Sequence, residues 1–183
     1  MHNEALDYCK KVAASLPQYF DSGNVLIVGS KEMNGNKMDG ALRRLFGKGA
    51  TVIGIDQQAG EGVDFVCNVR DYARDKPVPT FNTIVCTEML EHDEEWRGSV
   101  AAMLAMLAPK GLLLITCATG SRTIHGTKEG SGIYCGPHYE NVEWDQFAPF
   151  VGLDSEPNRG YWHTWNAGCN PVDLYFHGIK GGK

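Results

Sequence analysis

Two apolar stretches that each end in a chemically distinctive residue are the clearest sign of function in this sequence. Residues 25–28 lead into Gly29 and a polar loop, and residues 51–55 lead into Asp56. Small residues in such a loop let the backbone approach a ligand closely, and the loop amides can point at that ligand. A carboxylate after the second strand can accept hydrogen bonds from a ribose diol. The pattern therefore predicts a nucleoside site.

The spacing of these residues argues against a dinucleotide. Asp56 follows Gly29 by 27 positions, whereas the dinucleotide fingerprint places its acidic residue about 20 positions further on. The loop Gly29-Ser30-Lys31-Glu32-Met33-Asn34-Gly35 also lacks the G-x-G-x-x-G pattern. Support for a bound pyrophosphate is accordingly weak.

Strands that alternate with helices must position these residues. Apolar runs predict strands over 25–28, 51–55, 63–67, 81–87 and 112–117, with residues 109–111 turning the chain into the last of them. Helical spacing predicts helices over about 4–20, 38–46 and 93–107, and a helix capped by Asn141 that ends at 147. The alternation predicts an α/β, Rossmann-like, doubly wound and mostly parallel sheet with helices on both faces.

The C-terminal part is expected to close this sheet. Residues 172–179 form the clearest strand, and the Asn170-Pro171 turn before it indicates an antiparallel partner, at either 152–158 or 161–166. Ligands of such sheets bind outside the carboxyl ends of the strands. The residues at those ends, expected to meet in one crevice, are Gly29, Asp56, Asn68, Glu88 and Ala118. The long polar segment 118–139 would cover that crevice.

Composition narrows the class of protein. The chain has 183 residues, enough for the core of a single domain, and a formal net charge of −5 that argues against general nucleic-acid binding. It has no apolar run of membrane-spanning length and no evident signal peptide, so we expect a cytoplasmic protein without a membrane partner. Six cysteines without a C-x-x-C pair are expected to be reduced thiols.

Four segments together resemble class I S-adenosylmethionine-dependent methyltransferases. They are residues 25–30, residues 52–56, the stretch Phe81-Asn82-Thr83-Ile84-Val85-Cys86-Thr87-Glu88-Met89-Leu90-Glu91-His92, and residues 107–114. The resemblance implies a single domain with a leading helix (1–22), a cofactor-binding core (23–119) and a substrate-side region (120–183). It implies S-adenosylmethionine as the cofactor, held by Gly29, Ser30, Asn34, Gly35, Asp56, Gln57, Asn68, Val69, Glu88 and Met89. For Glu88, a helix N-cap is the alternative role.

The sequence departs from that family at four positions. Ile27 stands where an acidic residue usually helps to hold the methionine end of the cofactor, and Lys31 replaces a glycine. Asn68 replaces a frequent aspartate that faces the adenine amino group, although its side-chain oxygen can still accept a hydrogen bond. Asn82 replaces another aspartate, at a position expected to be structural.

Methyl transfer from a sulfonium needs mainly alignment and exclusion of water, so an indispensable catalytic side chain is not required. A general base is needed only when the acceptor must lose a proton. The candidates are His92, next to the predicted crevice, and His125, Tyr134, His138 and Tyr139 in the covering segment. Cys135, His138 and His125 provide too few ligands in a suitable spacing for zinc, so no metal site is predicted.

We therefore expect a methyltransferase that acts on an oxygen or nitrogen nucleophile of a small molecule, sugar or peptide, as a monomer or homodimer. Two alternatives stay open: a non-catalytic domain that binds S-adenosylmethionine, and a nicotinamide-dependent oxidoreductase. The strand-four segment contains no Asn/Asp-Pro-Pro-Tyr tetrapeptide and no Pro-Cys pair, which speaks against methylation of DNA bases.

Overall fold

A computed structural model describes residues 2–32, 40–76, 79–153 and 162–182 of the chain. Its strands form one seven-stranded sheet in the order β3-β2-β1-β4-β5-β7-β6. Their bounds are β1 Ser22–Val28, β2 Gly49–Asp56, β3 Phe65–Val66, β4 Phe81–Thr87, β5 Leu107–Ala118, β6 Trp162–Cys169 and β7 Asp173–Lys180. Only β7 runs antiparallel to the rest, as the sequence predicts.

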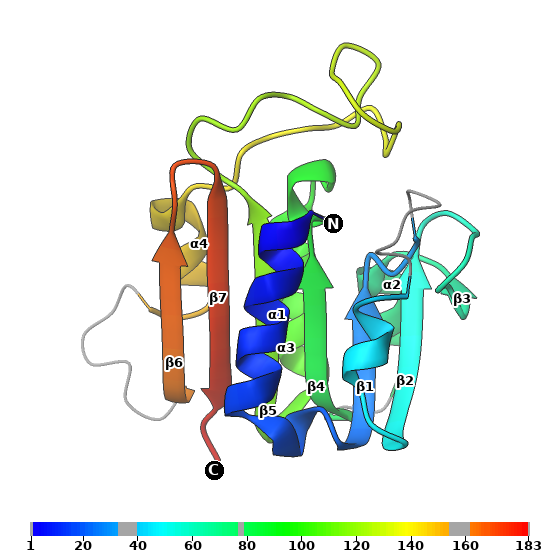
Figure 1. Cartoon of the computed structure of the whole chain (residues 1–183), viewed down its shortest axis with the longest axis vertical. Helices are drawn as coiled ribbons and strands as arrows, with labels where there is room; N and C mark the ends of the chain where they lie inside the picture. Colours follow the sequence, from blue (N-terminus) through cyan, green and yellow to red (C-terminus); the bar gives the residue numbers. More distant parts are fainter. Residues whose placement is uncertain (1, 33–39, 77–78, 154–161, 183) are drawn as a thin grey trace.

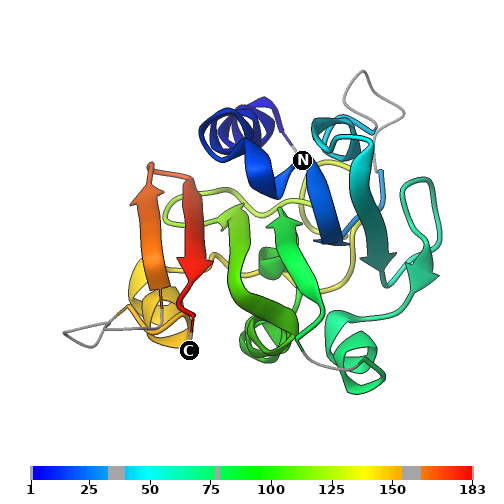
Figure 2. The same ribbon diagram turned by 90° about the horizontal axis from the view of Figure 1, so that it is seen from below.

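Helices cover both faces of the sheet (Figures 1 and 2). One face carries α1 (Asn3–Ser15) and the short 3-10 turns η1 (Pro17–Tyr19) and η2 (Arg43–Leu45). The other carries α2 (Val69–Arg74), α3 (Trp96–Met106) and α4 (Trp144–Phe150). Successive strand residues alternate between the two layers: Leu26 packs with the α3 face and Ile27 with the α1 face.

The predicted helices differ from the observed ones in five places. The helix expected over 4–20 ends at Ser15, and the one expected to end at 147 continues to Phe150. The described part of the predicted helix 38–46 is a turn followed by η2, and residues 38 and 39 lie outside the described part of the chain. The α3 helix begins at Trp96 and not at residue 93 as expected. The separate 3-10 turn η3 (Leu90–His92) precedes it. Asn141 does not cap α4; its amide group instead donates to the carbonyls of Gly120 and Arg122.

The C-terminal strands settle one alternative and correct one boundary. The partner of β7 is β6, which includes residues 162–166 of the second option; most of the first option lies outside the described residues. Residues 109–111 were expected to form a turn ahead of the fifth strand. They lie within β5, at a shift in its register with β4. Lys110 there has a φ of 63°, so the turn is a local bulge inside the strand.

The carboxyl ends of β1, β2, β4 and β5 all point to one edge of the sheet, over which residues 119–143 pass (Figure 1). The strand order reverses between β1 and β4, the place where open α/β sheets bind ligands. On the opposite edge, the side-chain oxygen of Asn82 accepts the Asn24 amide at 2.9 Å, which confirms a structural role for Asn82.

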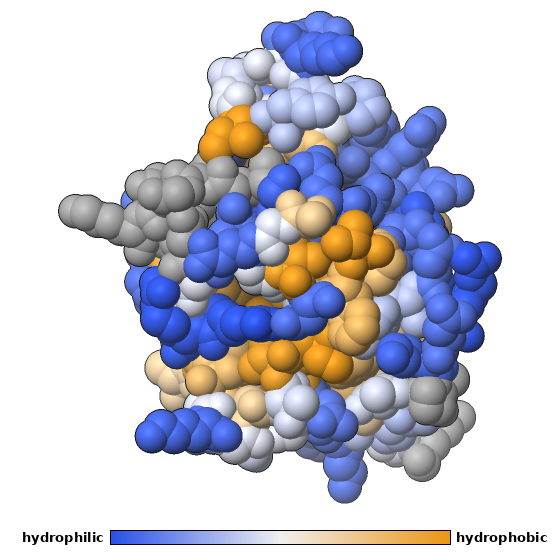
Figure 3. All heavy atoms as spheres, turned by 90° about the vertical axis from the view of Figure 1, so that its right-hand side faces the viewer, coloured by the Kyte–Doolittle hydropathy of each residue, from blue (hydrophilic) through white to orange (hydrophobic). Residues whose placement is uncertain are grey.

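Three further features concern the cysteines, the helices and the edge of the sheet. All six cysteines are free thiols, as predicted. No helix of the described residues is long and apolar enough to cross a membrane. The strand β3 forms one edge of the sheet, on the side where hydrophobic surface lies between hydrophilic margins in Figure 3; its Phe65 and Val66 are 48% and 59% exposed.

Candidate functional site

A cavity of about 440 Å³ opens at the carboxyl ends of β1, β2 and β4. This volume falls within the range of about 300–1,000 Å³ that is typical of small-molecule and cofactor sites. Eight of the ten residues predicted to bind a cofactor line it: Gly29, Ser30, Asp56, Gln57, Asn68, Val69, Glu88 and Met89. The other two, Asn34 and Gly35, lie outside the described residues. Ala118 was expected in the crevice but does not line it; its carbonyl accepts the Val142 amide.

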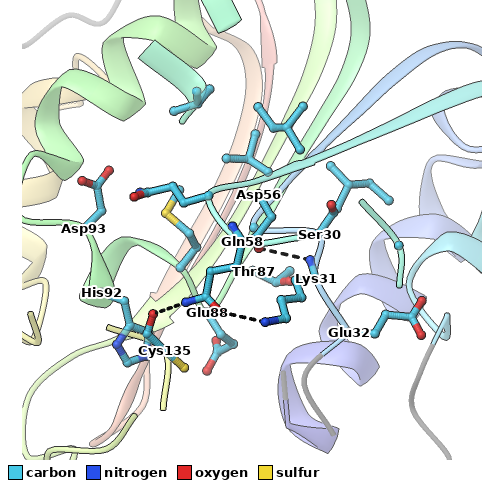
Figure 4. A pocket seen from close by; sticks show the side chains of 18 of the residues that line it. Ser30, Lys31, Glu32, Asp56, Gln58, Thr87, Glu88, His92, Asp93 and Cys135 are labelled. Atoms are coloured by element: carbon cyan, nitrogen blue, oxygen red, sulfur yellow. Dashed lines mark hydrogen bonds between the residues drawn. The ribbon is translucent and has the colours of Figure 1, made fainter. Parts of the chain in front are cut away.

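Asp56 is fixed by backbone donors at the cavity wall. Its Oδ2 accepts the Lys31 amide at 3.1 Å, and its Oδ1 accepts the Gln58 amide at 2.9 Å (Figure 4). A carboxylate oxygen has two lone pairs, so each oxygen can accept one further hydrogen bond. The carboxylate is therefore held in place and still able to accept two hydroxyl donors from the cavity.

The loop after β1 does not offer its first amides to a ligand, contrary to the sequence-based expectation. The amides of Gly29 and Ser30 both donate to the Ile55 carbonyl at 3.0 Å. Those of Lys31 and Glu32 donate to Asp56 and to the Glu61 carbonyl. The Ser30 hydroxyl, in contrast, is buried and has no hydrogen-bond partner among the described residues. The Ser30 hydroxyl is therefore a polar group of this loop that can form a hydrogen bond with a ligand.

Gly29 needs to be glycine for two reasons. Its φ is 71°, in the left-handed region, and an added Cβ would lie 2.8 Å from Cβ of Met89. We expect Gly29→Ala to lower the free energy of unfolding by more than about 1–2 kcal/mol, the cost of that backbone conformation alone. Urea unfolding measures it. Gly132→Ala is the control, because Gly132 has a φ of 88° but no atom within 4 Å of its Cβ position. Equal losses in the two variants would show that the contact with Met89 is unimportant.

A chain of hydrogen bonds joins the β1 loop to the covering segment. Lys31 Nζ donates to Oε1 of Gln58 at 2.7 Å, and Nε2 of Gln58 donates to the Cys135 carbonyl at 2.8 Å (Figure 4). All three residues line the cavity. Segment 119–143 is thus attached directly to the loop beside Asp56, so it closes one side of the cavity.

The wall near α2 and α3 is built from polar side chains that satisfy one another. The Asn68 side-chain oxygen caps α2 by accepting the Asp71 amide at 2.8 Å, which leaves it one lone pair for a ligand. Asp93, also in the wall, is buried. Nη1 of Arg70 donates to both its oxygens at 3.0 and 2.9 Å, and the Ser99 hydroxyl donates to it as well.

Glu88 borders the cavity but directs its carboxylate to other protein groups. It has a φ of 54°, and it does not cap α3, whose N-cap residue is Glu95. Its Oε1 accepts the Thr116 hydroxyl at 2.8 Å, and its Oε2 lies 2.9 Å from Nε2 of His2 on the α1 side of the sheet. Burial raises the pKa of Glu88, but the hydrogen bond and charge of His2 outweigh it, so the pKa lies below its ordinary value.

The same pair makes stability depend on pH. The hydrogen bond with Glu88, helped by the charge of Asp173 and opposed by burial, raises the pKa of His2 to about 9; Glu4 also pairs with it. Protonated His2 therefore stabilises the fold. This stabilisation is fully present below about pH 6.5 and is lost as the pH rises through 9. We expect wild type to lose about 2–3 kcal/mol more than His2→Gln between pH 6 and pH 10, measured by urea unfolding. Parallel pH profiles of the two proteins would contradict the assignment.

Three of the candidate general bases, His92, His125 and Tyr139, lie together, whereas Tyr134 lines the cavity from the covering segment. His92 lines the cavity, whereas His125 and Tyr139 do not; their ring centroids lie 5.2 and 5.5 Å from that of His92. Burial, then the charge of His125, lowers the pKa of His92 to about 4, so its imidazole is neutral near pH 7. Burial raises the pKa of Tyr139 to about 12. His92 is therefore a weak proton acceptor near pH 7, although it is placed at the cavity.

Sequence reasoning missed several residues of the cavity. Gln58 follows Asp56 by two positions, and a scan of polar residues after the second strand could have found it. Lys31 was noticed only as a departure from a family pattern. Cys135 and Pro137 reach the cavity from the covering segment, beside Tyr134, which the sequence offers as a candidate base. Their sequence carries no local signal of this placement, because it depends on how the segment folds back over the sheet.

Comparison with solved structures identifies the fold. No protein-family model and no curated protein matches the sequence. The chain is similar to the 1,6-didemethyltoxoflavin-N1-methyltransferase of Burkholderia thailandensis, solved with S-adenosylhomocysteine (TM-score 0.61, 15% identity, 97% of this chain and 78% of that one). It is also similar to an S-adenosylmethionine-dependent methyltransferase from Archaeoglobus fulgidus (TM-score 0.62, 11% identity, 96% of this chain and 94% of that one). A third similar structure is that of the 4+2 cyclase SpnF (TM-score 0.64, 12% identity, 97% of this chain and 81% of that one). At these identities the likeness shows the fold.

Proposed function

We propose that the protein is an S-adenosylmethionine-dependent methyltransferase. The observation that carries this proposal is the cavity at the switch point of the sheet, which brings Gly29, Asp56 and Asn68 together from three separate chain segments. The solved methyltransferases of the same fold support it, and one of them holds S-adenosylhomocysteine. The Rossmann-like fold itself serves many functions, so the side chains of the cavity must decide between them.

The described residues fit an adenosyl group. Asp56 presents two oxygens that can accept from a ribose diol, and the Asn68 oxygen keeps one lone pair for an adenine amino group. Ser30, next to Gly29, has a buried hydroxyl without a partner among the described residues. When bound, S-adenosylmethionine supplies an activated methyl group with a neutral leaving group.

The chain's own contribution is alignment and exclusion of water. Segment 119–143, tied down through Gln58 and Cys135, covers one side of the cavity. Aligning two bound reactants is worth up to about 7–11 kcal/mol of the barrier. A general base is needed only when the acceptor must lose a proton, and of the candidates named above His92 and Tyr134 line the cavity. We propose an oxygen or nitrogen acceptor on a small molecule, sugar or peptide, in the cytoplasm.

A second candidate is a domain that binds S-adenosylmethionine without catalysis. Ile27 lines the cavity, its side chain largely buried, where the resembling family usually has an acidic residue, and Lys31 stands where that family has a glycine. Both changes lie in the region that is expected to hold the methionine end of the cofactor. A domain of this kind would bind the cofactor and transfer no methyl group.

Ligand-induced stabilisation separates these functions. The melting temperature of the purified protein is measured with S-adenosylmethionine, S-adenosylhomocysteine and NAD in turn. A ligand at 100 times its dissociation constant stabilises by about 2.7 kcal/mol, so we expect a clear rise with both adenosyl ligands and none with NAD. A response to NAD alone would favour an oxidoreductase. Binding without transfer of a labelled methyl group to any acceptor of a broad panel would favour the non-catalytic domain.

A further inference from the structure

A second group of side chains lies beside the cavity, under the covering segment, and is not needed for cofactor binding. Glu91, His92 and His125 each place one ligand atom so that these atoms all lie within 4.8 Å of one another. The first two come from η3 after β4, and His125 comes from segment 119–143. We propose that these three residues form a binding site for one divalent transition-metal ion, with Zn²⁺ as the best-fitting ion.

The strongest reason is the state of Glu91. Its side chain is fully buried, and neither carboxylate oxygen has a hydrogen bond of normal geometry among the described residues. Burial, then the negative charge of Glu88, raises the pKa of Glu91 above its ordinary value, and the nearby backbone amides of Glu91 and Ala118 do not offset this. Buried carboxylates are normally paired, hydrogen-bonded or bound to metal. Glu88, the neighbouring buried carboxylate, already has partners, because it contacts Thr116 and His2.

Each histidine has one ring nitrogen engaged by the backbone and the other available. The Nδ1 of His125 lies 3.1 Å from the Thr123 carbonyl, to which it donates as the protonated nitrogen. His92 has a hydrogen bond with the backbone of His138, and its Nδ1 is buried with no partner among the described residues. Metal-binding histidines characteristically donate one N–H to a carbonyl while the other nitrogen binds the ion.

The covering segment holds His125 in position. The Gly126 amide donates to the Ser131 carbonyl at 2.7 Å, and its carbonyl accepts the Cys135 amide at 2.7 Å. The backbone passes so close to His92 that a Cβ on Gly126 would lie 2.8 Å from Cε1 of that ring. The edge of Tyr139 packs against His125, with ring centroids 4.8 Å apart. Two of the ligands are thus held together by backbone contacts that do not depend on an ion.

The donor set selects the kind of ion. Two imidazole nitrogens and one carboxylate oxygen are the protein ligands of several catalytic zinc sites, which keep a fourth position open. Zinc ligands lie about 2.0–2.2 Å from the ion, so two of them in a tetrahedral site are about 3.3–3.6 Å apart. At the observed limit of 4.8 Å, a pair of ligand atoms would have to move about 1.2–1.5 Å closer together, by rotation of the side chains, to bind the ion. Mg²⁺ and Ca²⁺ prefer oxygen ligands and fit this set poorly.

The test measures metal binding in the absence of cofactor and acceptor, so its outcome is independent of the proposed methyl transfer. The full chain, without an affinity tag, is treated with chelator, gel-filtered and titrated with Zn²⁺ against a chromophoric chelator. We expect one tightly bound equivalent. Glu91→Gln and His125→Gln should each weaken binding at least about tenfold, the smallest effect usual for a lost metal-site contact. Mg²⁺ at the same concentrations should not compete.

Matched variants exclude other ligands. His163→Gln removes an exposed histidine of β6, and Cys135→Ser removes the thiol beside Gly126; both should bind Zn²⁺ as wild type does. Because His125 lies in a loop, its variant tests the site even if Glu91→Gln fails to fold. Absence of a bound equivalent in wild type would overturn the proposal. So would unchanged affinity in His125→Gln, or loss of binding in Cys135→Ser alone.

Discussion

Asp56→Asn is expected to weaken the binding of S-adenosylhomocysteine by about 10- to 100-fold. The substitution keeps the shape of the side chain but removes its charge and replaces one acceptor oxygen with an amide donor. A hydrogen bond to a charged group is worth about 1.5–3 kcal/mol, and each 1.4 kcal/mol is tenfold in affinity. Because backbone amides fix the carboxylate in the wall of the cavity, the remaining lone pairs are ready for a ribose diol. Isothermal titration calorimetry measures the change.

A nearby carboxylate provides the control for Asp56. Asp64 also accepts a backbone amide of β2, that of Gly54 at 2.7 Å, but it does not line the cavity. Asp64→Asn should therefore bind S-adenosylhomocysteine within about twofold of wild type, since the substitution removes no group from the site. Equal affinities for the Asp56 and Asp64 variants would remove the ribose assignment.

Asp93→Ala is expected to lower the free energy of unfolding by about 3–5 kcal/mol, the loss typical when one partner of a buried ion pair is removed. The Asp93 side chain is 6% exposed. It accepts from Arg70, from the Ser99 hydroxyl and from the Glu95 amide at 3.1 Å, and so joins α2 to the start of α3. Without it, Arg70 and Ser99 lose their shared acceptor. Urea unfolding followed by circular dichroism measures the loss.

Glu95→Ala is the matched control for Asp93. Glu95 pairs with the same guanidinium, at 2.8 Å from Nη2 of Arg70, but its side chain is 72% exposed. Exposed pairs contribute about 0–1 kcal/mol because water screens them. If Glu95→Ala lowered the free energy of unfolding as much as Asp93→Ala, the burial of Asp93 would not explain its contribution to stability.

The sheet could be predicted from the sequence because each central strand is a short, continuous apolar run. Residues 81–87 coincide with β4, and residues 25–28 and 51–55 lie within β1 and β2. The helix α2 has six residues and buries only Val69 and Tyr72, too few to produce a helical repeat. The expected helix at 38–46 shows the opposite error: its apolar spacing resembled a helix, but residues 43–45 form a single 3-10 turn.

The first polar residues after each strand could be predicted because parallel strands bring their carboxyl ends together. This rule placed Asp56, Asn68 and Glu88 at the cavity. It did not reveal where each side chain points, so the pairing of Glu88 with His2 across the sheet was not foreseen. The group of Glu91, His92 and His125 depends on a loop that returns after more than 30 residues. Contacts of this kind leave no periodic trace in a sequence.

The structure of the protein crystallised with S-adenosylhomocysteine tests the central claim most directly. We predict electron density for the ligand in the cavity of about 440 Å³ at the ends of β1, β2 and β4, with its ribose hydroxyls donating to Asp56 and its adenine beside Asn68. Density for the ligand elsewhere, or an adenosine in the cavity whose ribose does not contact Asp56, would contradict the account.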